Sequence, residues 1–75
     1  MMEKLLELLK NIRPDVDFEN ETALIDDGFL DSFDVVSIIS EIEDVFGVQI
    51  RIAELDPENF NSVQSIWALI QKLQD

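Results

Sequence analysis

Residues 31–47 read Asp-Ser-Phe-Asp-Val-Val-Ser-Ile-Ile-Ser-Glu-Ile-Glu-Asp-Val-Phe-Gly and carry the strongest helix signal in the chain. Their apolar residues recur at helical spacing: Val35, Ile38, Ile39, Ile42, Val45 and Phe46. Such a stripe predicts an amphipathic helix that buries one face. Asp31 is a favourable N-cap, and Gly47 is the residue type that most often follows a helix end. We therefore predict a helix over residues 31–46.

Two further main helices are predicted, one on each side of this segment. Residues 2–12 repeat apolar side chains at helical spacing until Pro14 stops the pattern. Near the other end, Asn61 or Ser62 is expected to cap a helix with these apolar positions: Val63, Ile66, Trp67, Ile70 and Leu73. Residues 56–60 predict a short extra turn of helix, because Pro57 suits its first position.

The segments between these helices lack helical periodicity. Residues 15–30 contain scattered apolar side chains, which we expect to pack into the bundle from a long ordered loop: Phe18, Leu24, Ile25, Phe29 and Leu30. Residues 48–52 alternate like a strand, but a lone strand has no pairing partner, so we predict an extended connector. The predicted fold is an all-α bundle of three main helices plus one short helix, in a single domain over residues 1–75.

Composition restricts the classes of function. Acidic residues outnumber basic ones 17 to 5, and the net charge of −12 disfavours nucleic acids and anionic membranes as partners. The chain has no Cys and no His, so it offers neither a thiol nucleophile nor an imidazole base, and no Cys/His zinc site. No signal peptide or membrane span is evident. We therefore expect a cytoplasmic monomer that is not an enzyme and whose partners are proteins with basic surfaces.

Ser32 is the candidate for chemistry. With Asp31 as N-cap, Ser32 falls in the first helical turn, where free backbone N–H groups and the positive end of the helix dipole can stabilise a phosphate ester. The alternative is that Asp31 and Ser32 only cap a helix, which is the commoner use of such residues. On local sequence alone, this second interpretation is favoured.

A wider sequence pattern favours the first interpretation, a phosphate ester on Ser32, over a capping role alone. Residues 24–36, Leu-Ile-Asp-Asp-Gly-Phe-Leu-Asp-Ser-Phe-Asp-Val-Val, followed by residues 41–50, Glu-Ile-Glu-Asp-Val-Phe-Gly-Val-Gln-Ile, closely resemble the acyl carrier and peptidyl carrier protein family. The resemblance implies that Asp31 and Ser32 start the second helix and that Ser32 receives 4'-phosphopantetheine from coenzyme A. Phe33 stands where Leu is commoner in the family. The sequence between Gly28 and Ser32 is closest in style to stand-alone carriers such as D-alanyl carrier proteins.

The resemblance also implies partners and a docking surface. The partners are a phosphopantetheinyl transferase, a ligase that activates an acyl group or amino acid, and downstream acyl-processing enzymes with basic patches. The expected docking residues lie on the second helix: Phe33, Asp34, Val36, Ile39, Glu41, Glu43 and Asp44. The acidic members are placed on its exposed side. Two alternatives stay open, a merely solvated acidic face and core positions for Val36 and Ile39.

Two other interpretations compete with the carrier function. An acidic helical adaptor without a prosthetic group is the alternative function. A calcium loop from Asp15 is rejected, because Asn20 stands where a Gly is needed and Asp26 where a Glu is expected.

The cargo is expected to be small, since bulky Trp67 and Phe33 predict a filled interior.

Overall fold

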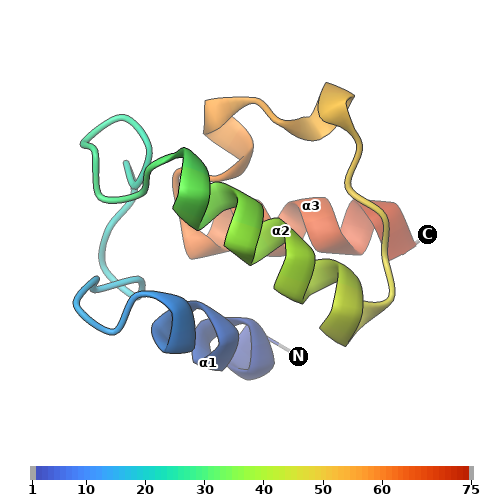
Figure 1. The fold of residues 1–75 in the computed structure, drawn as a ribbon, viewed down its shortest axis with the longest axis horizontal. Coiled ribbons are helices and arrows are strands. Elements are labelled where there is room, and N and C mark those ends of the chain that lie inside the picture. Colours follow the sequence, from blue (N-terminus) through green and yellow to red (C-terminus); the bar gives the residue numbers. More distant parts are fainter. Residues whose placement is uncertain (1, 75) are drawn as a thin grey trace.

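Three α-helices form the regular structure of a computed structural model, which describes residues 2–74 except for the side chain of Ile52. The helices, with two short 3-10 turns between the last two, are α1 (Met2–Ile12), α2 (Ser32–Phe46), η1 (Ile52–Glu54), η2 (Pro57–Asn59) and α3 (Val63–Gln74). Figure 1 shows α2 crossing in front of α3, with α1 below them. Residues 2–74 contain no strand, so the all-α prediction is confirmed.

Helix α2 begins and ends at the residues that the sequence indicates. The Asp31 carboxylate accepts the N–H of Asp34 at 2.9 Å, and the Asp34 carboxylate accepts the N–H of Asp31 at 3.2 Å. This reciprocal capping box satisfies two donors at the helix start. At the other end Gly47 adopts a φ of 68°, which a residue with a side chain rarely does, and its N–H donates to the carbonyl of Glu43.

The other two helices have equally local boundaries. The N–H of Arg13 donates to the carbonyl of Leu9 at 2.9 Å, and α1 ends there because Pro14 disfavours the helical conformation at the residue before it. Helix α3 is capped by Ser62, whose hydroxyl oxygen accepts the N–H of Ser65 at 3.1 Å. Of the two predicted caps, Ser62 is therefore the one used.

The core is built from all three helices and from the loop that precedes α2. Its fully buried side chains include Leu5 and Leu9 of α1, Ile38 and Ile42 of α2, and Ile66 and Ile70 of α3. From the loop, Phe18, Leu24 and Leu30 are buried and Ile25 packs against the same cluster. The predicted packing of the loop is thus confirmed for these residues and wrong for Phe29, whose side chain is on the surface with 37% exposed.

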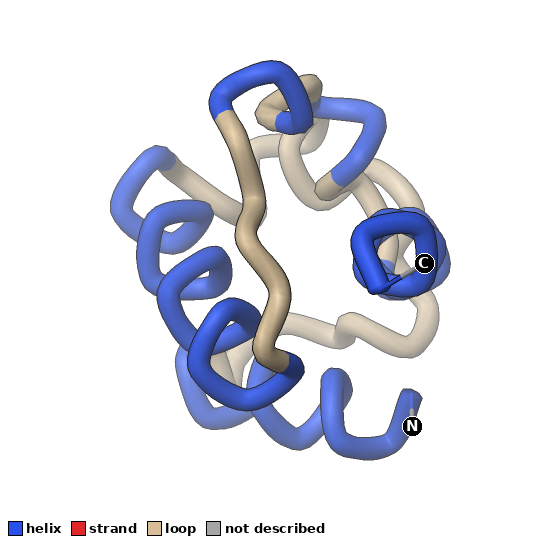
Figure 2. Tube along the Cα trace, turned by 90° about the vertical axis from the view of Figure 1, so that its right-hand side faces the viewer, coloured by secondary structure: helices blue, strands red, loops and turns tan. Residues whose placement is uncertain are grey.

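The segment between α2 and α3 is extended at first and then turns twice. Val48 and Ile50 are buried while Gln49 and Arg51 are exposed, without any strand pairing, as predicted for a connector. Figure 2 shows this connector running back along the bundle from the end of α2 towards the short turns. The predicted short helix is present only as η2, a single 3-10 turn that begins at Pro57. The four-helix form of the prediction is therefore not confirmed.

Within residues 2–74, no helix is both long enough and apolar enough to cross a bilayer.

Candidate functional site

Ser32 is the first residue of α2, and its side chain is exposed. The N–H groups of Asp34 and Val35 are already bonded to Asp31, through its carboxylate and its carbonyl. The N–H groups of Ser32 and Phe33 have no acceptor among the described residues, and the Ser32 hydroxyl makes no hydrogen bond to them either. Two backbone donors at the positive end of a helix thus lie beside an open hydroxyl, which suits a phosphate ester.

The loop that leads to Ser32 is anchored at the start of α3 by Asn61. The carbonyl of Asn61 accepts the N–H of Leu24 at 2.8 Å, and its side-chain Oδ1 accepts the N–H groups of Ile25 and Asp26 at 3.0 and 3.1 Å. The N–H of Leu30 then donates to the carbonyl of Leu24 at 3.0 Å, which closes the loop on itself. The backbone that leads to Ser32 is therefore held by hydrogen bonds at residues 24–26 and at Leu30.

A second anchor comes from the end of α1. Nη1 of Arg13 donates to the carboxylate of Asp34 and, at 3.1 Å, to the carbonyl of Phe29. Nε and Nη2 of the same guanidinium donate to the carboxylate of Asp15 at 3.0 and 2.9 Å. The hydrogen bond to Asp15 is the largest cause, and the hydrogen bond to Asp34 the second, of a pKa of Arg13 raised above its ordinary value. The hydrogen bond from Arg13 is also the main reason that the pKa of Asp15 is lowered.

Sequence reasoning did not identify Arg13. Nothing in the local pattern connects it with Asp34, which lies 21 positions along the chain. A weak signal is the composition: Arg13 is one of five basic residues in a chain with 17 acidic ones, which favours a carboxylate partner.

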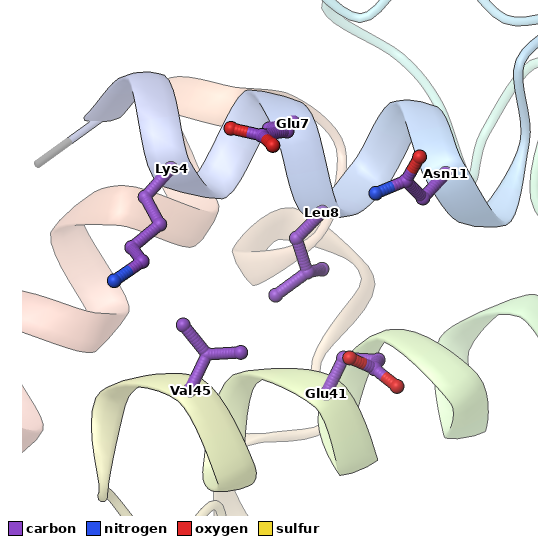
Figure 3. Close-up of a pocket in the computed structure, with 6 residues that line it drawn as sticks. All are labelled: Lys4, Glu7, Leu8, Asn11, Glu41 and Val45. Atoms are coloured by element: carbon purple, nitrogen blue, oxygen red, sulfur yellow. The ribbon is translucent and has the colours of Figure 1, made fainter.

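An apolar surface groove of about 470 Å³ lies beside Ser32. Its lining comes from the loop, the first half of α2 and the segment after η1: Ile25, Leu30, Asp31, Ser32, Val35, Val36, Ile39 and Leu55. A different groove lies between α1 and α2, and Figure 3 shows Lys4 and Leu8 of α1 and Val45 of α2 pointing towards it. That second groove has a volume of about 180 Å³ and contains no residue of the Ser32 segment. The groove next to Ser32 is therefore the larger of these two grooves.

The predicted docking residues separate into two groups. Four are exposed on α2: Phe33, Val36, Glu41 and Asp44. The other three are half-buried: Asp34, Ile39 and Glu43. The expectation that all four acidic residues face solvent is wrong for Asp34, which is bonded to Arg13, and for Glu43, whose carboxylate accepts the N–H of Ile50 at 3.0 Å. The core alternative fits Ile39 and fails for Val36, which is 64% exposed.

Of the two aromatic residues on which a filled interior was predicted, Trp67 packs against the core and Phe33 does not. Phe33 is 84% exposed and fills no part of the core. Trp67 is half-buried and meets Phe46 edge-on, with ring centroids 5.9 Å apart. Half of the argument for a small cargo therefore fails, because Phe33 lies at the surface beside Ser32.

Comparison with known proteins places most of the chain in one family. Residues 2–70 match the family described as "Phosphopantetheine attachment site". The D-alanyl carrier protein of Lactococcus lactis subsp. lactis is 27% identical over an alignment that covers 100% of this chain and 98% of that protein. The acyl carrier protein of Buchnera aphidicola is 40% identical over 71% of this chain and 65% of its own length. The D-alanyl carrier protein of Streptococcus equi subsp. zooepidemicus is 39% identical over 68% and 65%.

A capped helix that presents an open serine, in a chain matched almost throughout by one family, defines a carrier protein rather than an enzyme. The chain belongs to the phosphopantetheine attachment site family, and its role is that of an acyl or aminoacyl carrier. The prosthetic group of this family is 4'-phosphopantetheine.

Proposed function

We propose that Ser32 is the attachment point of 4'-phosphopantetheine and that the chain carries an acyl or aminoacyl group between partner enzymes. The observation that carries this proposal is the exposed Ser32 hydroxyl at the first position of a capped helix, inside the matched residues 2–70. When attached, the group supplies the thiol on which the cargo is held as a thioester. The chain has no Cys and cannot supply that thiol itself.

The residues around Ser32 suit a phosphodiester. Attachment forms a bond between the Ser32 oxygen and the phosphorus of the incoming group, breaks the bond to the departing nucleotide and releases the hydroxyl proton. The chain contains no His, and Oδ1 of Asp31 is engaged by the N–H of Asp34, so we expect the transferase to supply the base that takes the proton. The free N–H groups of Ser32 and Phe33 then stabilise the remaining negative charge.

The first test is direct modification of the wild-type protein. Incubation with coenzyme A, magnesium and a broadly acting phosphopantetheinyl transferase is expected to add one arm per chain, because a single exposed serine occupies the capped helix start. Intact-mass spectrometry before and after incubation measures the gain. An unchanged mass, together with salt-sensitive binding to a basic protein, would instead support the acidic adaptor.

We propose further that partner enzymes dock on the exposed part of α2. The apolar side chains of Phe33 and Val36 lie next to the attachment point, and the carboxylates of Glu41 and Asp44 follow them along the helix. Expected partners are the transferase, an activating ligase and downstream acyl-processing enzymes with basic patches. The similarity to D-alanyl carrier proteins supports an amino acid as the first cargo to test.

Neutralising the docking charges is expected to weaken recognition by the transferase. The double change Glu41→Gln and Asp44→Asn should raise KM for the carrier by about threefold or more at low salt, because each exposed charge contributes up to about 1 kcal/mol. The difference should shrink as salt increases. Steady-state kinetics at two ionic strengths measure both effects.

A matched control changes net charge equally on another helix. Gln64→Lys with Gln71→Lys on α3 also makes the chain less acidic by two charges, and both glutamines are exposed. An equal rise in KM for this control would show that total charge, rather than the α2 surface, determines recognition.

A further inference from the structure

We propose that Arg13 is a positioning residue for Ser32, an inference that rests on the proposed function of Ser32. Arg13 lies in the turn after α1, far from Ser32 in sequence, yet one nitrogen of its guanidinium contacts the chain on both sides of the attachment point. Nη1 donates to the carbonyl of Phe29, three residues before Ser32, and to the carboxylate of Asp34, two residues after it.

The contact with Asp34 reaches Ser32 through the capping box. The carboxylate of Asp34 also accepts the N–H of Asp31, and its own N–H donates to the carboxylate of Asp31. An N3 aspartate is shorter than the Glu or Gln usual in this motif, so its reach back to the N-cap leaves less freedom of orientation. By bonding the same oxygen, Oδ2, that accepts the N–H of Asp31, Arg13 fixes the orientation that closes the box.

The other two nitrogens of the guanidinium also donate hydrogen bonds, and the whole set requires an arginine. Nε and Nη2 form a two-bond contact with the carboxylate of Asp15 while Nη1 contacts the loop and Asp34. The side chain of Asp34 is only 14% exposed, whereas that of Arg13 is 31% exposed. A lysine has the charge but a single nitrogen, and it cannot reproduce this forked set of bonds.

The last turn of α1, just before Arg13, offers a matched control. Lys10 forms an ion pair with Glu19, and both side chains are at least half exposed and away from the α2 cap. The changes Arg13→Gln and Lys10→Gln both take the net charge from −12 to −13. On charge alone, a more acidic carrier should bind a basic enzyme as well as before or better. A positioning role for Arg13 predicts a lower kcat with KM little altered, which the change in net charge does not predict.

The experiment measures phosphopantetheine transfer to the wild-type chain and to the variants Arg13→Gln, Arg13→Lys and Lys10→Gln, each below its own unfolding temperature. Because small misplacement of a reacting group is costly, kcat should fall by about tenfold for both Arg13 variants and stay at the wild-type value for Lys10→Gln. The amide signals of Asp31 and Asp34, which are bonded in the capping box of the unmodified protein, should also shift and exchange faster in both Arg13 variants only. Circular dichroism shows whether each variant is folded.

Several outcomes would overturn the inference. A folded Arg13→Gln with the wild-type kcat would do so, as would a Lys10→Gln that slows equally or an Arg13→Lys that loses nothing. If Arg13→Gln does not fold, Arg13→Lys decides by the same measurements. If the wild-type chain accepts no arm, the proposed function fails, and the amide signals alone then test whether Arg13 holds the Ser32 turn.

Discussion

Replacing Ser32 by Ala is expected to abolish attachment of phosphopantetheine while leaving the fold intact. The substitution removes the hydroxyl oxygen that would form the phosphoester bond, and alanine cannot replace it. The Ser32 side chain is exposed and makes no hydrogen bond to the described residues, so the free energy of unfolding should change by no more than about 0.5 kcal/mol. Intact-mass spectrometry after incubation with the transferase measures attachment, and thermal unfolding measures stability.

A second serine on α2 provides the control. Ser37 is exposed on the same helix but lies beyond the first turn, where the backbone N–H groups are bonded within the helix. Ser37→Ala should therefore be modified at the wild-type rate. Continued modification of Ser32→Ala, or equal loss in Ser37→Ala, would show that the attachment point has been misassigned.

The features that could be predicted from the sequence are those fixed by neighbouring residues. The ends of α2 follow from Asp31 and Gly47, whose preferences act within one helical turn. The same is true of α1, which ends at Ile12 ahead of Pro14. The placement of Ser32 at the start of α2 is local in this sense, and the surrounding family pattern then gave it a chemical meaning.

The features that could not be predicted depend on contacts between distant segments. Helical periodicity assigns Asp34 and Glu43 to the polar side of α2, but it does not show that Arg13 and the N–H of Ile50 come to meet them. In the same way, periodicity does not determine how much of a helix is covered. Only Ile38 and Ile42 of α2 are buried, whereas Val36 is 64% exposed and Val45 39% exposed.

Two aromatic residues of the long loop differ in burial in a way that the sequence does not show. Phe18 and Phe29 both occur in an aperiodic segment with acidic neighbours, and the sequence treats them alike. In the structure Phe18 is completely buried, whereas Phe29 is partly exposed and contributes its carbonyl to Arg13. The loop that holds both residues is anchored at Arg13 and Asn61 by contacts between distant segments, which local propensity does not reveal.

Phe18→Ala is therefore expected to be the most destabilising single change in the loop. Removing a fully buried aromatic ring costs about 3–5 kcal/mol, through lost burial and the cavity left behind. A chain of 75 residues has a free energy of unfolding of only about 4–11 kcal/mol, so this loss would remove a large share of it. Urea unfolding followed by circular dichroism measures the change in midpoint and slope.

Phe33→Ala is the matched control for this prediction, since it deletes the same ring from a side chain that is 84% exposed. Its free energy of unfolding should change by less than about 0.5 kcal/mol, because little apolar surface is buried there. Equal losses for the two variants would contradict the assignment of Phe18 to the core. A large loss for Phe18→Ala alone would show that the loop before α2 is part of the folded core.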